Sequence, residues 1–201
     1  MPIAACRCCP GRSAPAAAIV FASDHGESLG EQDLWFGHGE RLGEAQIHVP
    51  LWLALPGVSP GRRDDIVSLL DVLPTLEAAF LDASGAAYSG RALLAPGAAE
   101  ASSSVYLATL QGSQQRRVGV IEGDFKYVVV LRNERDWDGR LTHRGDDRVD
   151  LTAPAPQIAA RLRARLEQLI RTHDGTPGVE LKLDAEDRER MRALGYLDAG
   201  G

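Results

Sequence analysis

A short apolar run that ends in an acid and an imidazole is the feature that most constrains this chain. Residues Ile19 to Ala22 are short and β-branched enough to predict a buried strand. The run stops at Ser23-Asp24-His25-Gly26, where the glycine allows a sharp turn. Ligands of α/β sheets bind beyond the carboxyl ends of the strands, and an Asp–His pair there offers a divalent ion one oxygen and one nitrogen donor. We therefore predict that Asp24 and His25 are metal ligands. The alternative, on spacing alone, is that Asp24 caps the next segment and His25 is a solvated loop residue.

Three further stretches follow this run in a fixed order. Trp35-Phe-Gly-His-Gly39 leads to Ile47-His-Val-Pro-Leu-Trp-Leu53, Val67 to Leu76 contains D-x-x-P-T, and Leu183 to Leu197 ends in R-A-L-G-Y-L. Together with the S-D-H-G-E stretch they resemble the late catalytic segment and the C-terminal ending of the sulfatase family, within the alkaline-phosphatase-like superfamily. The resemblance runs from about Ala18 to the C-terminus. Four ordered motifs make it specific, whereas each motif alone would be weak.

The resemblance implies an α/β fold: the C-terminal part of an alkaline-phosphatase-like α/β sheet domain, followed by a small antiparallel β-sheet plus helix subdomain. We expect a disordered leader over residues 1–17, a partial sulfatase-type α/β domain over 18–95, and the antiparallel sheet and helix subdomain over 96–201. Three strands are expected in the α/β part, at residues 18–22, 51–55 and 66–70. A helix capped by Asp71 is expected to run to Leu81. This alternation of strand and helix favours a mostly parallel sheet.

The second half of the chain has strand and helix signals of its own. Three apolar runs predict strands, at residues 105–109, 117–122 and 125–132. Glu122-Gly-Asp124 predicts a tight hairpin turn. Residues 148–152 resemble a further strand of the family, and residues 157–172 carry the apolar stripe of a helix. A last helix is expected from Asp184, as its cap, to Leu194, closed by Gly195.

His38 is the candidate catalytic residue. It lies between two glycines, which let an imidazole approach a ligand closely. The resemblance implies that His38 contacts the sulfuryl or phosphoryl group or protonates the leaving group; the residues alone leave an exposed loop histidine as the alternative. A divalent cation and donor side chains stabilise the negative charge that grows as such an ester is cleaved. Typical sulfatases hold Ca²⁺, whereas the nitrogen donor of His25 favours Zn²⁺ or Mn²⁺.

The function implied by the resemblance is metal-dependent hydrolysis of a sulfated small molecule or glycan. The pattern D-H-G-E-S-L-G-E followed by H-G also resembles lipid A phosphoethanolamine transferases, which use zinc. Phosphoethanolamine transfer or phosphoester hydrolysis is therefore one alternative. Another is a non-catalytic remnant, or a half that associates with a separately encoded N-terminal half.

The segment that supplies the nucleophile in sulfatases has no clear counterpart in this sequence. The family motif is C-x-P-S-R, and its cysteine is converted to formylglycine. Cys8-Cys9-Pro10-Gly11-Arg12 fits C-x-P-x-R, but Gly11 replaces the serine and the family motif lies far upstream of the S-D-H-G strand. We interpret it as a chance match and expect the lone chain to be inactive.

Composition limits the partners that the chain can have. With 201 residues, 44% of them hydrophobic and 25% charged, a packed core is expected. The net charge of -6 gives no support for nucleic acid or an anionic membrane surface as a partner. No apolar run approaches the ~20 residues of a membrane-spanning helix. The first residues lack a signal-peptide core, so the sequence gives no localisation, although a full-length family member would be compatible with the periplasm or with secretion.

Overall fold

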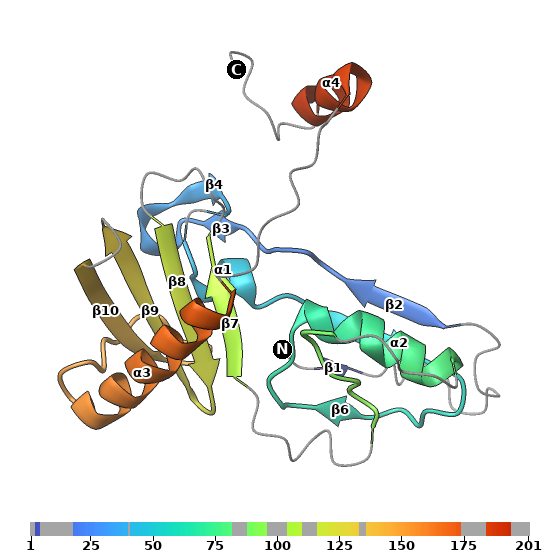
Figure 1. Cartoon of the computed structure of the whole chain (residues 1–201), viewed down its shortest axis with the longest axis horizontal. Coiled ribbons are helices and arrows are strands. Elements are labelled where there is room, and N and C mark those ends of the chain that lie inside the picture. The colour runs from blue at the N-terminus through green and yellow to red at the C-terminus, as the bar shows by residue number, and fades with distance from the viewer. Residues whose placement is uncertain are drawn as a thin grey trace. The chain divides into compact units, whose positions relative to one another are not determined.

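The computed structural model of the chain is shown in Figure 1. It describes residues 3–4, 18–39, 41–81, 88–95, 104–109, 116–132, 136–173 and 184–193. The chain separates into two units, residues 1–169 and 170–201, and the boundary between them lies within the last turns of helix α3. Within the ranges given above, no helix has both the length and the apolar character needed to cross a bilayer.

The first sheet has the strand order β2-β5-β1-β6. These strands are Ile19–Ala22, Leu51–Ala54, Ile3–Ala4 and Arg62–Arg63. Strand β5 pairs with β2 in the antiparallel sense and with β1 in the parallel sense, and β1 pairs with β6 in the antiparallel sense. The expectation of a mostly parallel sheet is therefore wrong for these strands. Parallel neighbours need a long crossover, usually a helix, whereas only short elements connect β2 to β5.

Strand β2 is exposed where the sequence predicts a buried strand. All four of its residues are exposed, and Ile19 retains 61% of its accessible surface. Its only neighbour among the described strands is β5, so β2 forms an edge of the sheet. A β-branched run identifies a strand, but burial also requires partners on its faces.

The core of the α/β part lies between β5 and helix α2, Val72–Phe80. Leu51 and Leu53 project from one face of β5 into this core, and Val72 and Leu76 of α2 pack against it. Trp52, which projects from the other face of β5, is exposed. The period of two residues expected of a strand is therefore visible in the burial of β5.

The strand expected at residues 66–70 is not present. This stretch leads into a 3₁₀ turn, Leu69–Asp71, because Ser68 and Asp71 form a capping box. The Asp71 carboxylate accepts a hydrogen bond from the Ser68 amide at 2.9 Å, and the Ser68 hydroxyl accepts one from the Leu70 amide at 3.3 Å. Ser68 is therefore the N-cap of the helical segment, which begins one turn earlier than expected, and Asp71 lies at the N3 position of the capping box. The expected cap of α2 by Asp71 is wrong, because its side chain makes no capping hydrogen bond to that helix.

The second sheet is antiparallel throughout, with the order β10-β9-β8-β7. The strands are Ser104–Ala108 (β7), Arg116–Glu122 (β8), Phe125–Arg132 (β9) and Asp136–His143 (β10). The three predicted strands are confirmed, whereas β10 was not predicted. The tight turn between β8 and β9 is confirmed too, with Gly123 at φ 59° where glycine is favoured. Residues 148–152 form turns and not the expected strand.

Helix α3, Pro156–His173, covers one face of this sheet (Figure 1). Leu162 and Leu166 are fully buried, and the Arg165 guanidinium donates to the Ser104 hydroxyl of β7 at 2.9 Å. In the second unit, helix α4 spans Ala185–Ala193. The Asp184 carboxylate accepts a hydrogen bond from the Asp187 amide at 2.9 Å, which confirms its role as a cap. The predicted end at Leu194 and Gly195 lies outside the described residues.

Candidate active site

The turn after β2 is fixed by main-chain contact with helix α1, Glu44–Ile47. The Gly26 amide donates to the Gln46 carbonyl at 2.8 Å. A Cβ atom at position 26 would lie 2.0 Å from the carbonyl oxygen of Ala45, so only glycine fits here. The S-D-H-G turn is therefore held against α1 by backbone atoms.

Asp24 and His25 lie side by side at this turn. The His25 amide donates to Asp24 Oδ1 at 2.9 Å, and His25 Nε2 lies 3.8 Å from Asp24 Oδ2. His25 Nδ1 lies 3.0 Å from the Gly26 carbonyl, which can only accept. With its proton on Nδ1, the imidazole donates a hydrogen bond to the Gly26 carbonyl. The lone pair then lies on Nε2, the nitrogen nearer to the Asp24 carboxylate.

His38 is brought to the same place by a short hairpin. Strands β3, Ser28–Leu29, and β4, Trp35–Gly37, pair in the antiparallel sense. The imidazole of His38 stacks on that of His25, with ring centroids 4.1 Å apart and planes inclined by 16°. His38 Nδ1 lies 3.7 Å from the Glu27 carboxylate. The structure thus brings together all three residues singled out in the sequence, although the stacking itself was not foreseen.

Gln46 fixes the hairpin and was not predicted from the sequence. Its side-chain amide is buried and donates to the Ser28 hydroxyl at 2.9 Å and to the Gly37 carbonyl at 3.2 Å. These two acceptors lie on opposite strands of the hairpin that precedes His38. A single glutamine in a one-turn helix belongs to no motif, so the sequence offered no signal for it.

A cavity of about 600 Å³ joins these residues to both sheets. Asp24, His25 and His38 line it together with cationic side chains, which are Arg41, Arg62 and Arg144. Its apolar wall includes Val105 and Leu107 of β7 and Ile121 of β8. From the sequence, the site was expected in the α/β part alone, and this contribution of the antiparallel sheet was not predicted.

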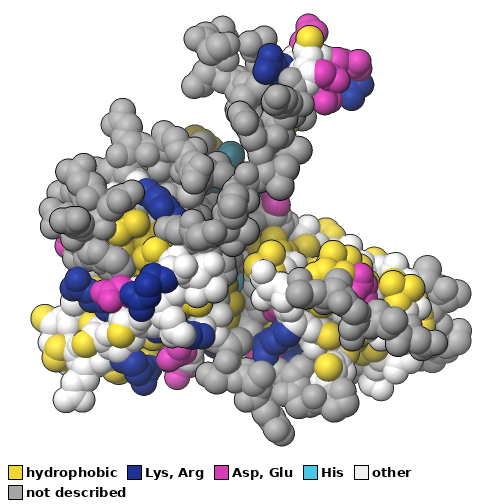
Figure 2. Space-filling view, in the orientation of Figure 1, with side chains coloured by type: hydrophobic (Ala, Val, Ile, Leu, Met, Phe, Trp, Pro, Cys, Tyr) yellow, Lys and Arg dark blue, Asp and Glu magenta, His cyan; other side chains and the backbone are white. Residues whose placement is uncertain are grey.

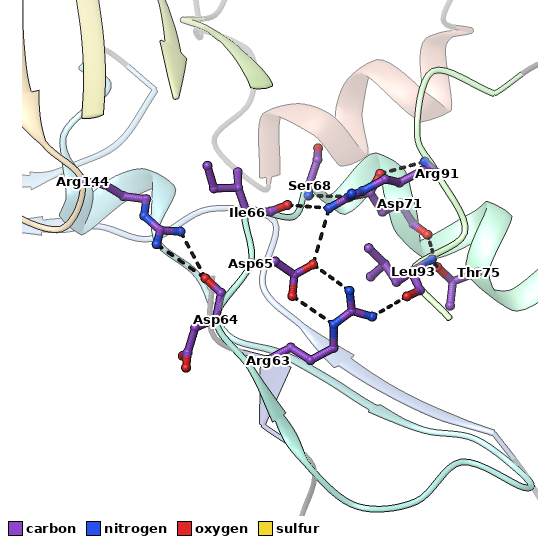
Figure 3. A network of polar contacts seen from close by, with 10 residues as sticks. All are labelled: Arg63, Asp64, Asp65, Ile66, Ser68, Asp71, Thr75, Arg91, Leu93 and Arg144. Atoms are coloured by element: carbon purple, nitrogen blue, oxygen red, sulfur yellow. Dashed lines mark hydrogen bonds and ion pairs between the residues drawn. The ribbon is translucent and has the colours of Figure 1, made fainter. Parts of the chain in front are cut away.

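A network of polar contacts holds the cavity wall at residues 64–69 (Figure 3). Arg63 forms a bidentate pair with Asp65 at 2.9 and 2.8 Å. Arg91 donates to the Ile66 carbonyl at 2.9 Å, and its own amide donates to Asp71 at 2.8 Å. From the antiparallel sheet, Arg144 reaches the Asp64 carbonyl at 3.4 Å. These bonds fix the main chain of the wall at several points.

His48 lines the cavity beside the end of α1. Its Nδ1 lies 3.8 Å from the Glu44 carboxylate. Burial lowers the pKa of His48 below its usual value, with a further contribution from Arg144, while Glu44 acts in the opposite direction. The imidazole is therefore held toward its neutral form.

The Asp24–His25 pair fits two positions of a divalent ion's coordination shell. Donors that lie 2.1 to 2.4 Å from one ion are separated by about 3 to 4.5 Å, and these two atoms are 3.8 Å apart. No cluster of three or more His, Cys, Asp or Glu suited to a metal occurs in the part of the chain that the structure describes. The chain thus offers a partial donor set, an oxygen and a nitrogen.

Comparison with known proteins shows which family part of the chain resembles. The family model described as Sulfatase matches residues 13–82, which include β2, the hairpin, α1, β5 and α2. A stretch of 58 residues is 48% identical to the choline-sulfatase of Rhizobium meliloti (strain 1021). Residues 13–82 of the chain are therefore similar to the sulfatase family.

Solved structures show the sulfatase fold beyond the matched segment. A Bacteroides fragilis protein named as the sulfatase yidJ superposes with a TM-score of 0.62 at 16% identity, over 77% of this chain. The protein BT4656, solved with its substrate D-glucosamine-2-N,6-O-disulfate, superposes with a TM-score of 0.60 at 20% identity, over 82% of this chain. The expected α/β fold with its small antiparallel sheet and helices is therefore confirmed.

The chain corresponds to only part of each of these proteins. The choline-sulfatase match covers 29% of this chain and 11% of that protein. The chain covers 35% and 36% of the two solved structures. A large share of the sulfatase fold therefore has no counterpart in these 201 residues.

Proposed function

We propose that this chain contributes one side of an active site that hydrolyses sulfate esters with a divalent metal ion. One observation supports the proposal above all others. Asp24, His25 and His38 come from two different loops, yet they line one cavity with their imidazoles stacked 4.1 Å apart. The side chains of Asp24, His25 and His38 are 79%, 41% and 43% exposed, so a ligand in the cavity could reach all three.

In this proposal Asp24 Oδ2 and His25 Nε2 hold the ion, and His38 contacts an oxygen of the sulfuryl group or protonates the leaving group. A bound divalent ion supplies Lewis-acid stabilisation of the charge that grows on the ester oxygens. The carbonyl of Gly26 contacts His25 Nδ1 at 3.0 Å, and this contact would leave Nε2 as the nitrogen available to a metal ion. The nitrogen donor favours Zn²⁺ or Mn²⁺ over the Ca²⁺ of typical sulfatases.

The proposed substrate is a sulfated small molecule or glycan. The cationic groups Arg41, Arg62 and Arg144 line the same cavity and suit a sulfate anion. The sugar disulfate bound by the neighbour BT4656 is an example of such a compound. A phosphate ester would meet the same groups, so the comparison of sulfate and phosphate esters is part of the test.

We further propose that the isolated chain binds metal but does not turn over substrate, because it offers two donors and no assigned nucleophile. The exposure of β2 favours the alternative in which this chain associates with a separate polypeptide over the alternative of a non-catalytic remnant. Phe21 and Trp52 stack with ring centroids 5.1 Å apart on a sheet face that leaves both half-exposed. In α/β domains such faces are normally covered, and a polypeptide that supplies the rest of the sheet would cover this one.

Metal titration tests the proposal. Isothermal titration of the purified chain with Zn²⁺, Mn²⁺ and Ca²⁺ is expected to show one site that is weakened at least tenfold by Asp24→Asn or His25→Gln. The matched controls Asp150→Asn and His143→Gln change an exposed acid and a histidine that does not line the cavity, and they should bind as the original chain does. Equal binding by all variants would refute the metal site. Metal-dependent hydrolysis of a sulfate ester by the lone chain would refute its inactivity, and a preference for phosphate esters would favour the phosphoester alternative.

A further inference from the structure

We propose that Lys126 of β9 is a positioning residue for the stacked pair His25 and His38, and that it acts through helix α1. A catalytic role for this positioning rests on the proposed function, but the effect of Lys126 on the placement of His25 and His38 can be tested without an activity assay. Lys126 lies 82 residues from Glu44 in sequence and does not line the cavity.

The Lys126 ammonium is buried between the antiparallel sheet and the start of α1. Only 2% of its side chain is exposed. Its Nζ lies 2.5 Å from Asp147 Oδ1 and 2.7 Å from Glu44 Oε1, and it donates to the Leu42 carbonyl at 3.1 Å. All three ammonium donors therefore have an acceptor, which is the condition under which a buried charge is tolerated.

The same cluster holds the first turn of α1. Asp147 Oδ2 accepts a hydrogen bond from the Glu44 amide at 2.6 Å, so the carboxylate that pairs with Lys126 also caps the helix. Helix α1 has only four residues, too few to be stable alone. Its position must come from outside contacts, and two of them, at Glu44 and at Leu42, end on Lys126.

From α1 the contacts continue to both imidazoles. The Gln46 carbonyl accepts from the Gly26 amide, next to His25, and the Gln46 side chain donates to the Gly37 carbonyl, next to His38. One residue of α1 thus fixes the main chain beside each ring. A shift of α1 would change the two loops together, and the stacking of the rings depends on their relative placement.

The stacked rings provide a direct readout. Each imidazole lies in the ring current of the other, so the Hε1 proton shifts of His25 and His38 report the stacking. His143 serves as an internal reference, because it stacks on Phe125, whose side chain leaves β9 on the face opposite to Lys126. Two-dimensional ¹H–¹³C spectra of the imidazoles, with unfolding midpoints measured in parallel, separate positioning from stability.

Lys126→Met and Asp147→Asn are expected to move the His25 and His38 signals while that of His143 stays. Lys126→Met leaves two partly buried carboxylates facing each other, 16% and 18% exposed, so a fall in the unfolding midpoint is expected as well. In the triple variant Lys126→Met/Glu44→Gln/Asp147→Asn all three charges of the cluster are gone, and the midpoint should recover while the histidine signals stay displaced. Arg165→Ala removes a cation from the other side of the antiparallel sheet and is the control that should leave both signals in place.

The outcomes separate this inference from the proposed function. Recovery of both the midpoint and the histidine signals in the triple variant would overturn the inference, because Lys126 would then serve stability alone. Unchanged signals in folded Asp147→Asn would overturn it too. If the original chain binds no Zn²⁺ or Mn²⁺ while the signals still move, the positioning role stands and the metal proposal fails. If metal binds, the triple variant should bind it about tenfold more weakly.

Discussion

The two sheets of this chain were recognised from the same kind of sequence signal, yet they differ in what supports them. In the antiparallel sheet, Val118, Val120 and Val129 are fully buried. In the first sheet, every residue of β2 is exposed although its sequence is just as apolar. The antiparallel sheet is formed by strands that follow one another and is covered by the next helix along the chain. The first sheet needs partners from elsewhere, and β2 has only β5 beside it among the described strands.

Local sequence patterns therefore specify a strand more securely than they specify its burial. Hairpin strands find their neighbours within a few residues, so their pairing and burial follow together. An α/β sheet collects its strands over long separations, so a segment can keep its strand conformation while its faces stay uncovered. Figure 2 shows hydrophobic side chains on the surface in the region of α2, where Leu73 and Phe80 are exposed.

The largest expected effect is on the core of the antiparallel sheet. Leu141→Ala, at a fully buried position of β10, should lower the free energy of unfolding by about 2 to 5 kcal/mol. The same change at half-exposed Leu73 of α2 should cost less than about 1 kcal/mol, because little packing is lost there. Chemical denaturation measures both. Equal losses would show that the two regions are equally well packed.

A smaller effect is expected at two carboxylates, one in each region. Asp71 is buried and accepts hydrogen bonds from the amides of Ser68 and Arg91. Asp71→Asn replaces one acceptor by a donor and should cost about 1 to 3 kcal/mol. Asp150 is half-exposed and accepts from the Thr152 amide, so Asp150→Asn should cost less than about 0.5 kcal/mol. Unfolding midpoints that rank the two variants in the reverse order would contradict this.

The uncovered sheet face should affect the solubility of the chain more than its stability. Phe21→Ser together with Trp52→Ser removes the exposed aromatic pair, and we expect less self-association with a stability change below about 1 kcal/mol. Light scattering over a concentration series measures it. Val149→Ser, at an isolated exposed position beyond the antiparallel sheet, is the matched control. If the control reduces scattering as much, the face of β2 and β5 has no special role.

The smallest expected effect concerns pH and His48. Its pKa is lowered in the folded chain, so as the pH falls below about 6.5 the unfolded chain takes up the proton first and the folded state loses stability. His48→Gln should therefore lose less stability than the original chain between pH 7 and pH 5. Because 45% of the side chain is exposed, solvent screening limits the difference in stability to about a few tenths of a kcal/mol. Thermal unfolding at matched pH values measures it, and a variant that is more sensitive to acid would show the opposite sign.

The sequence predicted the chemical groups of the candidate site better than their supports. Asp24, His25 and His38 were found because each belongs to a motif read along the chain. Gln46 and Lys126 were not found as supports, since their contacts span 18 and 82 residues and single buried polar residues leave no periodic signal. The prediction of a mostly parallel sheet was wrong, and strand β10 was not predicted, for a related reason. The pairing of a strand is decided by its partners and not by its own residues. How Asp24, His25 and His38 act on a metal or a substrate stays a prediction.

The backbone contact between Gly26 and helix α1 has a consequence for how the residues of the cavity can vary. With a carbonyl occupying the place of a side chain, the acid–imidazole turn and its supporting helix meet as peptide against peptide. Peptide geometry is common to all residues, so substitutions in the surrounding side chains can retune the charge and polarity of the cavity while the gap between these two segments stays constant. At this point of the chain, side-chain chemistry can therefore vary without a change in the distance between the turn and α1.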